Sequence, residues 1–238
     1  MLAMRSTLLL AAAFTAAVGV RSPAQCAPAP PRPTTIVGEP QPFENEIAQF
    51  EAADKVTPPP KNSVVFVGSS SIRVWPNLQA DFPGVDVVQR GFGGSMLDEV
   101  DHYAPRIVLP YCPRLIVLYA GDNDLAEGKT PEQILSDFKT FVSLVRGPMP
   151  KTRIVFVSIK PSTARVTLLD KMRETNALVR EYIAADPSLT YVDVFTPMLG
   201  PTGLPRGELF QSDGLHMNAQ GYAIWRDLLQ PVVSATTH

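Results

Sequence analysis

The sequence predicts an α/β fold in which a parallel β-sheet lies between layers of helices. Five short and almost wholly apolar runs recur between residues 64 and 194, and such runs are typical of strands that are covered on both faces. Stretches with helical spacing of apolar residues separate them, and this alternation predicts a parallel sheet with helices on both sides. A length of 238 residues suits one domain with a full hydrophobic core.

The predicted strands cover residues 64–67, 85–88, 115–119, 154–157 and 191–194. Helices are expected at residues 43–53, after Thr130, at 168–184 and at 219–229. The clearest helix start is Thr130-Pro131-Glu132-Gln133, in which Thr130 is the N-cap, proline takes the first helical position and Gln133 completes a capping box. In folds of this class ligands bind at the carboxyl ends of the strands, so the segments that follow the strands are where a site is expected.

The N-terminal residues differ in composition from the rest of the chain. A short segment with one positive charge precedes an apolar stretch over residues 6–20, and the small residues Ser22 and Ala24 follow it. This pattern predicts a signal peptide over residues 1–24 and an exported protein, periplasmic or secreted, without a stable membrane span after cleavage. An uncleaved N-terminal anchor is the alternative. Residues 25–42 are rich in proline and predict a stiff linker, and residues 43–238 form the predicted folded domain.

Charge and cysteine content exclude some classes of function. The formal net charge is -2 and no run of Lys or Arg occurs, so the chain has no general reason to bind nucleic acid or an anionic membrane. Two cysteines are too few for a disulfide framework or for a metal site with cysteine spacing. A bridge between Cys26 and Cys112 and a buried, unpaired Cys112 both fit the sequence.

Two of the segments at predicted strand ends contain serine and glycine. Gly68-Ser69-Ser70-Ser71 follows the first strand, where a serine is either a nucleophile or simply the N-cap of the next helix. Gly91-Phe92-Gly93-Gly94 follows the second strand. The N–H group of Gly94 can approach a ligand closely because no side chain intervenes, although a plain flexible turn has the same composition.

Two further segments contain polar side chains suited to acyl transfer. In Gly121-Asp122-Asn123-Asp124 the amide of Asn123 can donate to developing negative charge, although Asx-rich turns are common and this one lacks the acids of a calcium loop. In Asp213-Gly214-Leu215-His216 the imidazole has a carboxylate three residues away that can hold its tautomer. Together, the segments supply a serine, a base for it and oxyanion donors.

With these four segments in this order, the sequence resembles the SGNH (GDSL-type) hydrolases, and within them the platelet-activating-factor acetylhydrolase-like subgroup. The resemblance covers roughly residues 45–231. It implies a flavodoxin-like three-layer α/β/α sandwich with a five-stranded parallel sheet, and an enzyme without metal or organic cofactor. It implies Ser70 as nucleophile, His216 as base and Asp213 as its orienting acid, with an oxyanion hole formed by the N–H groups of Ser70 and Gly94 and the amide of Asn123. The family commonly has aspartate where Ser69 stands, and we expect this difference to tune the site.

Together with the predicted signal peptide, the resemblance indicates an exported serine esterase that hydrolyses a carboxylic ester of a small molecule or a glycan. The absence of a long apolar lid segment favours a short acyl or O-acetyl group. Trp75 is either a platform for a sugar ring or part of the core, and core packing is the commoner role of an aromatic residue. The alternative function is a catalytically silent exported protein that binds a ligand or glycan on the same fold. The sequence sets neither the acyl group and alcohol nor the oligomeric state.

Overall fold

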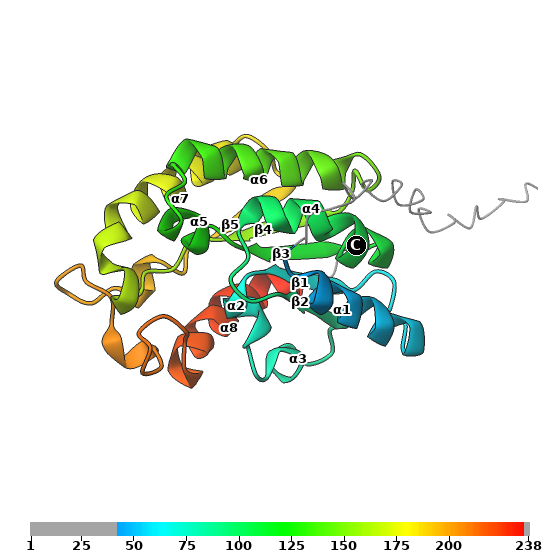
Figure 1. Cartoon of the computed structure of the whole chain (residues 1–238), viewed down its shortest axis with the longest axis horizontal. Helices are drawn as coiled ribbons and strands as arrows, with labels where there is room; N and C mark the ends of the chain where they lie inside the picture. Colours follow the sequence, from blue (N-terminus) through cyan, green and yellow to red (C-terminus); the bar gives the residue numbers. More distant parts are fainter. Residues whose placement is uncertain (1–41, 236–238) are drawn as a thin grey trace, which may run out of the picture.

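The computed structural model describes residues 42–235 and shows a three-layer α/β/α sandwich (Figure 1). The predicted signal peptide and all but the last residue of the predicted linker lie outside the described residues. The predicted fold class is confirmed, because five strands form one all-parallel sheet with helices packed on both of its faces. No helix among residues 42–235 combines the length and apolar character needed to cross a membrane.

The three inner strands of the sheet are almost wholly buried, and the two edge strands are more exposed. The order is β2-β1-β3-β4-β5, with the strands at β1 (Val64–Gly68), β2 (Val87–Gly91), β3 (Leu115–Tyr119), β4 (Arg153–Val157) and β5 (Leu189–Val192). In the register of this sheet, Gly68 at the end of β1 lies beside Gly91 of β2 and Tyr119 of β3. The segments that follow these three strands therefore leave the sheet side by side, at the carboxyl ends of the strands.

Helices cover the two faces of the sheet in separate groups (Figure 1). One face carries α1 (Glu44–Val56), α4 (Leu97–Ile107), α6 (Pro131–Arg146) and α7 (Leu169–Ala184). The other face carries α2 (Ser70–Arg73), α3 (Leu78–Asp81) and α8 (Ala219–Val233). The short helix α5 (Asp122–Ala126) follows β3, and four 3-10 turns lie at Leu109–Tyr111, Thr163–Leu168, Thr196–Met198 and Gly207–Leu209.

Trp75 belongs to the hydrophobic core beneath the sheet. Its side chain is 2% exposed and packs at 4.9 Å against the ring of Tyr222 and at 5.9 Å against the ring of Trp225. Its indole N–H donates to Asp81 at 2.6 Å, so the polar atom of the ring is also satisfied. Core packing of Trp75 is confirmed, and the alternative role as a sugar platform is wrong.

The two edge strands begin at other residues than the sequence predicted. β2 covers Val87–Gly91 instead of residues 85–88, and β5 covers Leu189–Val192 instead of residues 191–194. In β2 the edge position allows polar residues, because Gln89 bonds the carbonyl of Ile72 at 2.6 Å and Arg90 pairs with Asp54. An all-apolar run is typical of a central strand. A prediction based on such runs therefore misplaces the bounds of an edge strand, which has only one neighbouring strand.

Two smaller predictions are decided by the structure. The capping box at Thr130 is confirmed: the Gln133 N–H donates to Thr130 Oγ1 at 3.3 Å, and the Thr130 N–H donates to Gln133 Oε1 at 2.8 Å. Cys112 is disulfide-bonded and half-buried, so the alternative of a buried unpaired cysteine is wrong. The other cysteine of the sequence, Cys26, lies outside the described residues.

Candidate active site

Gly68 turns the chain from the end of β1 into the segment that contains Ser70. Its φ of 135° lies in a region that side chains disfavour, and a Cβ at this position would lie 1.8 Å from the carbonyl oxygen of Tyr119. The chain therefore passes directly against β3, and the N–H of Ser69 donates to that same carbonyl at 3.0 Å. As a result, Ser70 is placed at the first residue of α2, at the carboxyl edge of the sheet.

The three residues predicted as a triad form a continuous chain of hydrogen bonds. Ser70 Oγ lies 3.0 Å from His216 Nε2, and His216 Nδ1 lies 2.6 Å from Asp213 Oδ2. Ser70 and His216 are separated by 146 positions in the sequence, so the fold and not local chain geometry brings them together. Both are half-buried, and Asp213 is exposed.

The second carboxylate oxygen of Asp213 holds the turn in which His216 lies. Asp213 Oδ1 accepts the N–H groups of Leu215 at 2.9 Å and of His216 at 3.0 Å. The hydrogen bond from the His216 side chain, together with these backbone bonds, lowers the pKa of Asp213 to about 2. Asp213 is therefore a carboxylate at neutral pH and can only accept, which favours a proton on His216 Nδ1 and leaves Nε2 free to accept from Ser70.

The predicted oxyanion donors lie on the neighbouring segments. Gly94 is exposed and has a φ of 84°, and Asn123 lies in α5, where its Nδ2 donates to the carbonyl of Ser95 at 3.0 Å. An amide nitrogen carries two hydrogens, so one donor of Asn123 remains beyond this bond. In the described part of the chain, the N–H groups of Ser70 and Gly94 donate to no protein acceptor.

Ser69 stands where the resemblance expects an aspartate, and its side chain is buried. Its hydroxyl has no hydrogen-bond partner among the described residues. A neutral hydroxyl loses less on burial without a partner than a carboxylate would, so serine is the less costly residue in these surroundings.

A buried ion cluster behind Asn123 was missed by the sequence analysis. Lys160, which is 1% exposed, pairs with Asp122 at 3.1 Å, and Arg165 pairs with the same carboxylate oxygen at 3.1 Å. Burial alone would raise the pKa of Asp122, but the two cations overcome this effect and lower it. The available signal was a lysine three residues after the predicted fourth strand, in a region where ligand-binding groups are expected.

Arg165 continues this cluster to the predicted oxyanion donor. Its guanidinium donates to Asn123 Oδ1 at 2.8 Å. The two residues before Arg165 contact the turn 213–216, which contains Asp213 and His216 and is called the triad turn below. The Ala164 N–H and Thr163 Oγ1 donate to the carbonyl of Gly214 in this turn at 3.0 and 3.1 Å. One short segment thus contacts both sides of the predicted site.

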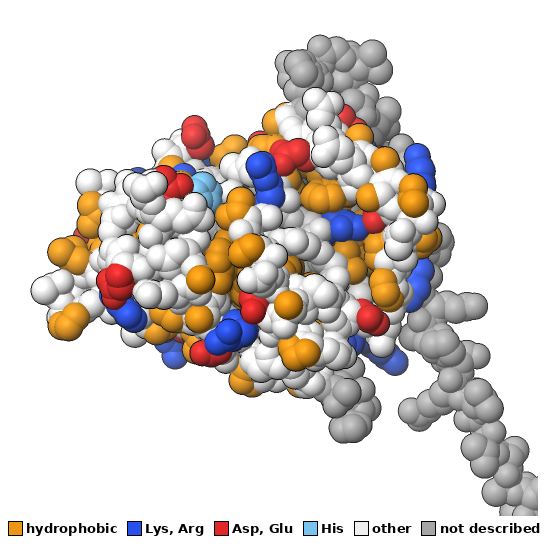
Figure 2. Space-filling view, turned by 90° about the horizontal axis from the view of Figure 1, so that it is seen from below, with side chains coloured by type: hydrophobic (Ala, Val, Ile, Leu, Met, Phe, Trp, Pro, Cys, Tyr) orange, Lys and Arg blue, Asp and Glu red, His pale blue; other side chains and the backbone are white. Residues whose placement is uncertain are grey.

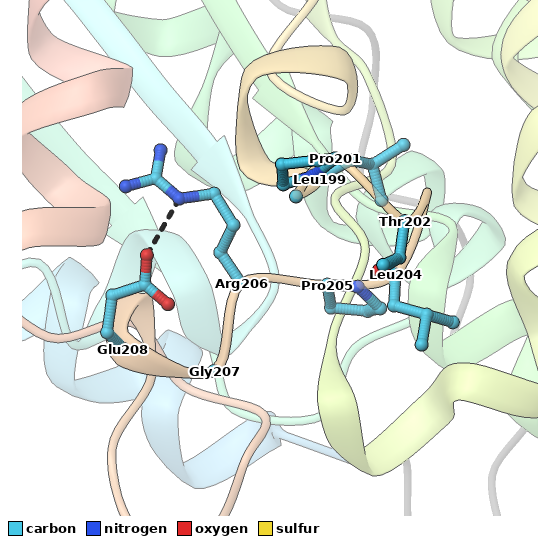
Figure 3. Close-up of a pocket in the computed structure, with 9 residues that line it drawn as sticks. Leu199, Pro201, Thr202, Leu204, Pro205, Arg206, Gly207 and Glu208 are labelled. Carbon is cyan, nitrogen blue, oxygen red and sulfur yellow. Dashed lines mark hydrogen bonds and ion pairs between the residues drawn. The ribbon is translucent and has the colours of Figure 1, made fainter.

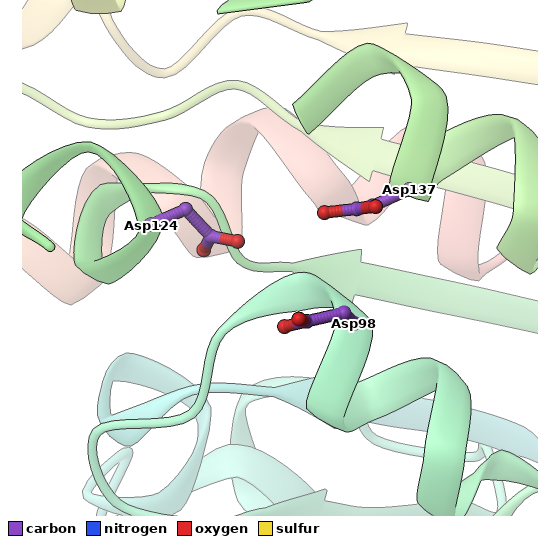
Figure 4. Close-up of side chains that lie close together, drawn as sticks. All are labelled: Asp98, Asp124 and Asp137. Atoms are coloured by element: carbon purple, nitrogen blue, oxygen red, sulfur yellow. The ribbon is translucent and has the colours of Figure 1, made fainter. Parts of the chain in front are cut away.

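Three carboxylates near α5 have the spacing of a metal site, but a lysine occupies their centre. The side chains of Asp98, Asp124 and Asp137 point toward one another from α4, α5 and α6 (Figure 4). The ammonium of Lys129 lies 2.8, 3.2 and 2.9 Å from these three carboxylates, respectively. Asp124 also accepts the N–H of Leu97 at 2.9 Å. This cluster therefore joins three helices around an internal cation.

A hollow of about 480 Å³ lies in the loop that precedes the triad turn (Figure 3). Its lining includes Leu199, Leu204 and the ion pair between Arg206 and Glu208 at 2.8 Å. On the face shown in Figure 2, basic and acidic side chains of the described residues are interspersed, and neither kind gathers into a continuous patch.

Comparison with known proteins identifies the class to which this fold and site belong. The model of the GDSL-like lipase/acylhydrolase family matches residues 62–224. The chain therefore belongs to this family, and it is an SGNH-type hydrolase of carboxylic esters. No curated protein matches the sequence.

Solved structures share the fold at low sequence identity. A protein from Streptococcus pneumoniae, provisionally named a platelet activating factor, aligns with a TM-score of 0.72 at 20% identity over 80% of this chain and 92% of its own. A GDSL-like lipase from Bacteroides thetaiotaomicron aligns with a TM-score of 0.67 at 20% identity over 79% of this chain and 96% of its own. An acetyl esterase variant crystallised with acetate aligns with a TM-score of 0.56 at 14% identity over 71% of this chain and 95% of its own.

Proposed function

We propose that the protein is an exported serine esterase that removes a short acyl or O-acetyl group, with Ser70 as its nucleophile. The observation that carries this proposal is the chain of contacts from Ser70 Oγ to His216 Nε2 at 3.0 Å and from His216 Nδ1 to Asp213 at 2.6 Å. Distances of this size allow a proton to pass from the hydroxyl to the imidazole as the nucleophile attacks.

The geometry supports a two-step reaction through an acyl-enzyme. Ser70 Oγ attacks the ester carbonyl carbon while His216 Nε2 takes the hydroxyl proton, and the carbonyl oxygen becomes an oxyanion. The N–H groups of Ser70 and Gly94 and the amide of Asn123 donate to this oxyanion. The tetrahedral intermediate then breaks the bond to the alcohol oxygen, which leaves with the proton from His216. Water, deprotonated by His216, attacks the acyl-enzyme and releases the acid and free Ser70.

Two observations support a short acyl group. After the predicted signal peptide, the sequence contains no long apolar segment of the kind that forms a lid over a long acyl chain. The fold is also shared with an acetyl esterase crystallised with acetate. A small alcohol or a glycan would be the other half of the ester.

Export is supported by the composition of the N-terminus and by Cys112. Residues 1–24 have the three regions of a signal peptide. Cys112 is disulfide-bonded, and disulfides persist mainly in oxidising compartments. Mass measurement of protein recovered from the periplasm or medium tests this part, and a mature protein that still begins at Met1 would contradict cleavage.

A panel of p-nitrophenyl esters from acetyl to palmitoyl tests the activity. We expect kcat/KM to be highest for the shortest chains, and Ser70→Ala to lose roughly a thousandfold or more. Ser69→Ala is the matched control, because the Ser69 hydroxyl is buried without a hydrogen bond, and we expect it to retain most of the activity. An organophosphonate should label Ser70 in peptide mapping. A folded protein that takes no label and cleaves no ester would instead support the silent binding protein.

A further inference from the structure

We infer that Arg165 is a positioning residue that orients and polarises the amide of Asn123 for the oxyanion. This inference rests on the proposed function, because it assigns a role to Arg165 through Asn123. Its basis is the hydrogen bond from the Arg165 guanidinium to Asn123 Oδ1 at 2.8 Å.

Arg165 determines which way the Asn123 amide faces. A guanidinium has donors only, so the amide atom that faces it must be the oxygen. The nitrogen is then turned away from Arg165, where it donates to the carbonyl of Ser95 at 3.0 Å and keeps one further hydrogen. If the amide were rotated by 180°, its NH2 group would meet the guanidinium and its oxygen would meet the Ser95 carbonyl, and both contacts would be repulsive. Arg165 and the Ser95 carbonyl together thus exclude the orientation in which Asn123 could not donate to an oxyanion.

Arg165 itself is fixed from two sides. Asp122 binds its guanidinium at 3.1 Å, and Lys160 pairs with the same carboxylate from the buried side. The backbone next to Arg165 is fixed by the bonds of Thr163 and Ala164 to the carbonyl of Gly214, in the turn between Asp213 and His216. The backbone at Arg165 departs from helical angles, with φ at -121° and ψ at 31°, inside the 3-10 turn Thr163–Leu168. The guanidinium is therefore held in place on a segment that also holds the triad turn.

A charged donor on the amide oxygen has a chemical consequence for the nitrogen. It draws electron density toward Oδ1 and makes the remaining N–H a stronger donor, as expected for bonds that polarise one another inside a protein. This effect grows with the negative charge on the partner, so it favours the tetrahedral oxyanion over the uncharged ester. The expected signature is a change in kcat with little change in KM.

Arg165→Met tests the inference, because methionine keeps the apolar length of the side chain and removes its donors. We expect kcat on p-nitrophenyl acetate to fall by about 10- to 100-fold while KM changes by less than about threefold. Arg165→Lys keeps the positive charge and an ammonium donor, so its kcat should lie between those of Arg165→Met and the unmodified protein. Arg173→Met is the matched control: Arg173 pairs with Asp170 within α7, so its replacement should leave kcat unchanged. Thermal melts show whether each variant is folded.

A double-mutant cycle with Asn123→Ala separates a positioning role from a general structural one. If Arg165 acts through Asn123, Arg165→Met should cost less than about threefold in the Asn123→Ala background. An equal loss in both backgrounds, or an unchanged kcat for Arg165→Met while Asn123→Ala is impaired, overturns the inference and leaves the proposed function intact. Full activity of Ser70→Ala would overturn the proposed function itself. If Arg165→Met does not fold, Arg165→Gln replaces it: the glutamine amide can donate to Asn123 Oδ1 but carries no charge, so its kcat should be lower than that of Arg165→Lys, and equal values contradict the inference.

Discussion

Replacement of Asp213 by asparagine tests the most specific geometry of the proposed triad. In the protein as described, Asp213 Oδ1 accepts two backbone N–H groups and Oδ2 faces His216 Nδ1 at 2.6 Å. An asparagine must keep its oxygen toward the two N–H groups, so its NH2 group must face Nδ1 of His216. The imidazole then carries its proton on Nε2, which donates toward Ser70 and cannot accept the hydroxyl proton. We expect Asp213→Asn to fix the wrong tautomer.

The expected loss of kcat follows from this reversal of the His216 tautomer and from the solvent exposure of Asp213. Asparagine in place of the orienting aspartate of a Ser-His-Asp triad costs about 10⁴-fold in kcat. The side chain of Asp213 is 47% exposed, so water can compete with the amide for Nδ1. We therefore expect a loss of about 10³- to 10⁴-fold, or roughly 4–5.5 kcal/mol of transition-state stabilisation. Asp213→Ala leaves both tautomers accessible and should lose less activity than Asp213→Asn.

The assay is kcat/KM on p-nitrophenyl acetate across pH 5 to 9, with thermal melts of each variant. Because the pKa of Asp213 is lowered to about 2, this carboxylate stays ionised over the whole range, and its titration contributes nothing to the pH profile. Asp193→Asn is the matched control, since Asp193 is another aspartate in a turn, which accepts the N–H of Thr196 at 3.0 Å. Activity of Asp213→Asn within tenfold of the unmodified protein, or above that of Asp213→Ala, would refute this reasoning.

Three further predictions concern stability and are measured by urea unfolding. Gly68→Ala should lower the free energy of unfolding by more than about 3 kcal/mol or prevent folding, because the added Cβ would lie 1.8 Å from a backbone oxygen. Gly128 also has a positive φ, of 94°, but open space around its Cβ position, so Gly128→Ala should lose much less. Trp75→Ala should cost about 3–5 kcal/mol through the cavity it leaves, and a loss below 1 kcal/mol would contradict its place in the core. Burial raises the pKa of Asp101 to about 8, so this residue favours unfolding increasingly as the pH rises from about 4 to 8. Asp101→Asn should therefore stabilise the protein at pH 8 more than at pH 4, and equal effects at both values would contradict the shift.

The central layer of the fold could be predicted from the sequence because central strands in a parallel sheet have few permitted compositions. β1 and β3 are buried along their whole length, and the apolar runs at residues 64–67 and 115–119 identify them. The edge strands β2 and β5 each have one neighbour, and β2 contains Gln89 and Arg90, whose polar groups bond to helices outside the sheet. A criterion based on apolar runs finds such strands but misplaces their bounds, because their polar residues are satisfied by contacts that are distant in sequence.

The candidate site divides in the same way into local and distant parts. Asp213 and His216 lie three residues apart in one turn, and Ser70, Gly94 and Asn123 each follow a strand, so chain order and chemistry indicated the four segments, and the family resemblance named the residues within them. Arg165 offers no comparable signal, because its contact with Asn123 spans 42 positions and depends on how the segment after β4 crosses the edge of the sheet. A single sequence shows that an arginine is present at position 165, but it does not show the path of the chain that brings this arginine to Asn123.

The segment after β4 explains why the two halves of the site keep a fixed separation. Asn123 follows β3 and His216 precedes α8, and no strand register joins them directly. Residues 163–165 contact both, through the bonds of Thr163 and Ala164 to Gly214 and of Arg165 to Asn123. An oxyanion hole works only if its donors are preorganised relative to the nucleophile and its base, since a displacement of about 1 Å can cost a hundredfold in rate.

Thr163→Val keeps the shape of the residue and removes its bond to Gly214, so it should loosen the triad turn and lower kcat by about three- to tenfold. Thr167→Val, on the same turn, is the control, and an equal kcat for both variants would show that the segment does not hold the triad turn through Thr163.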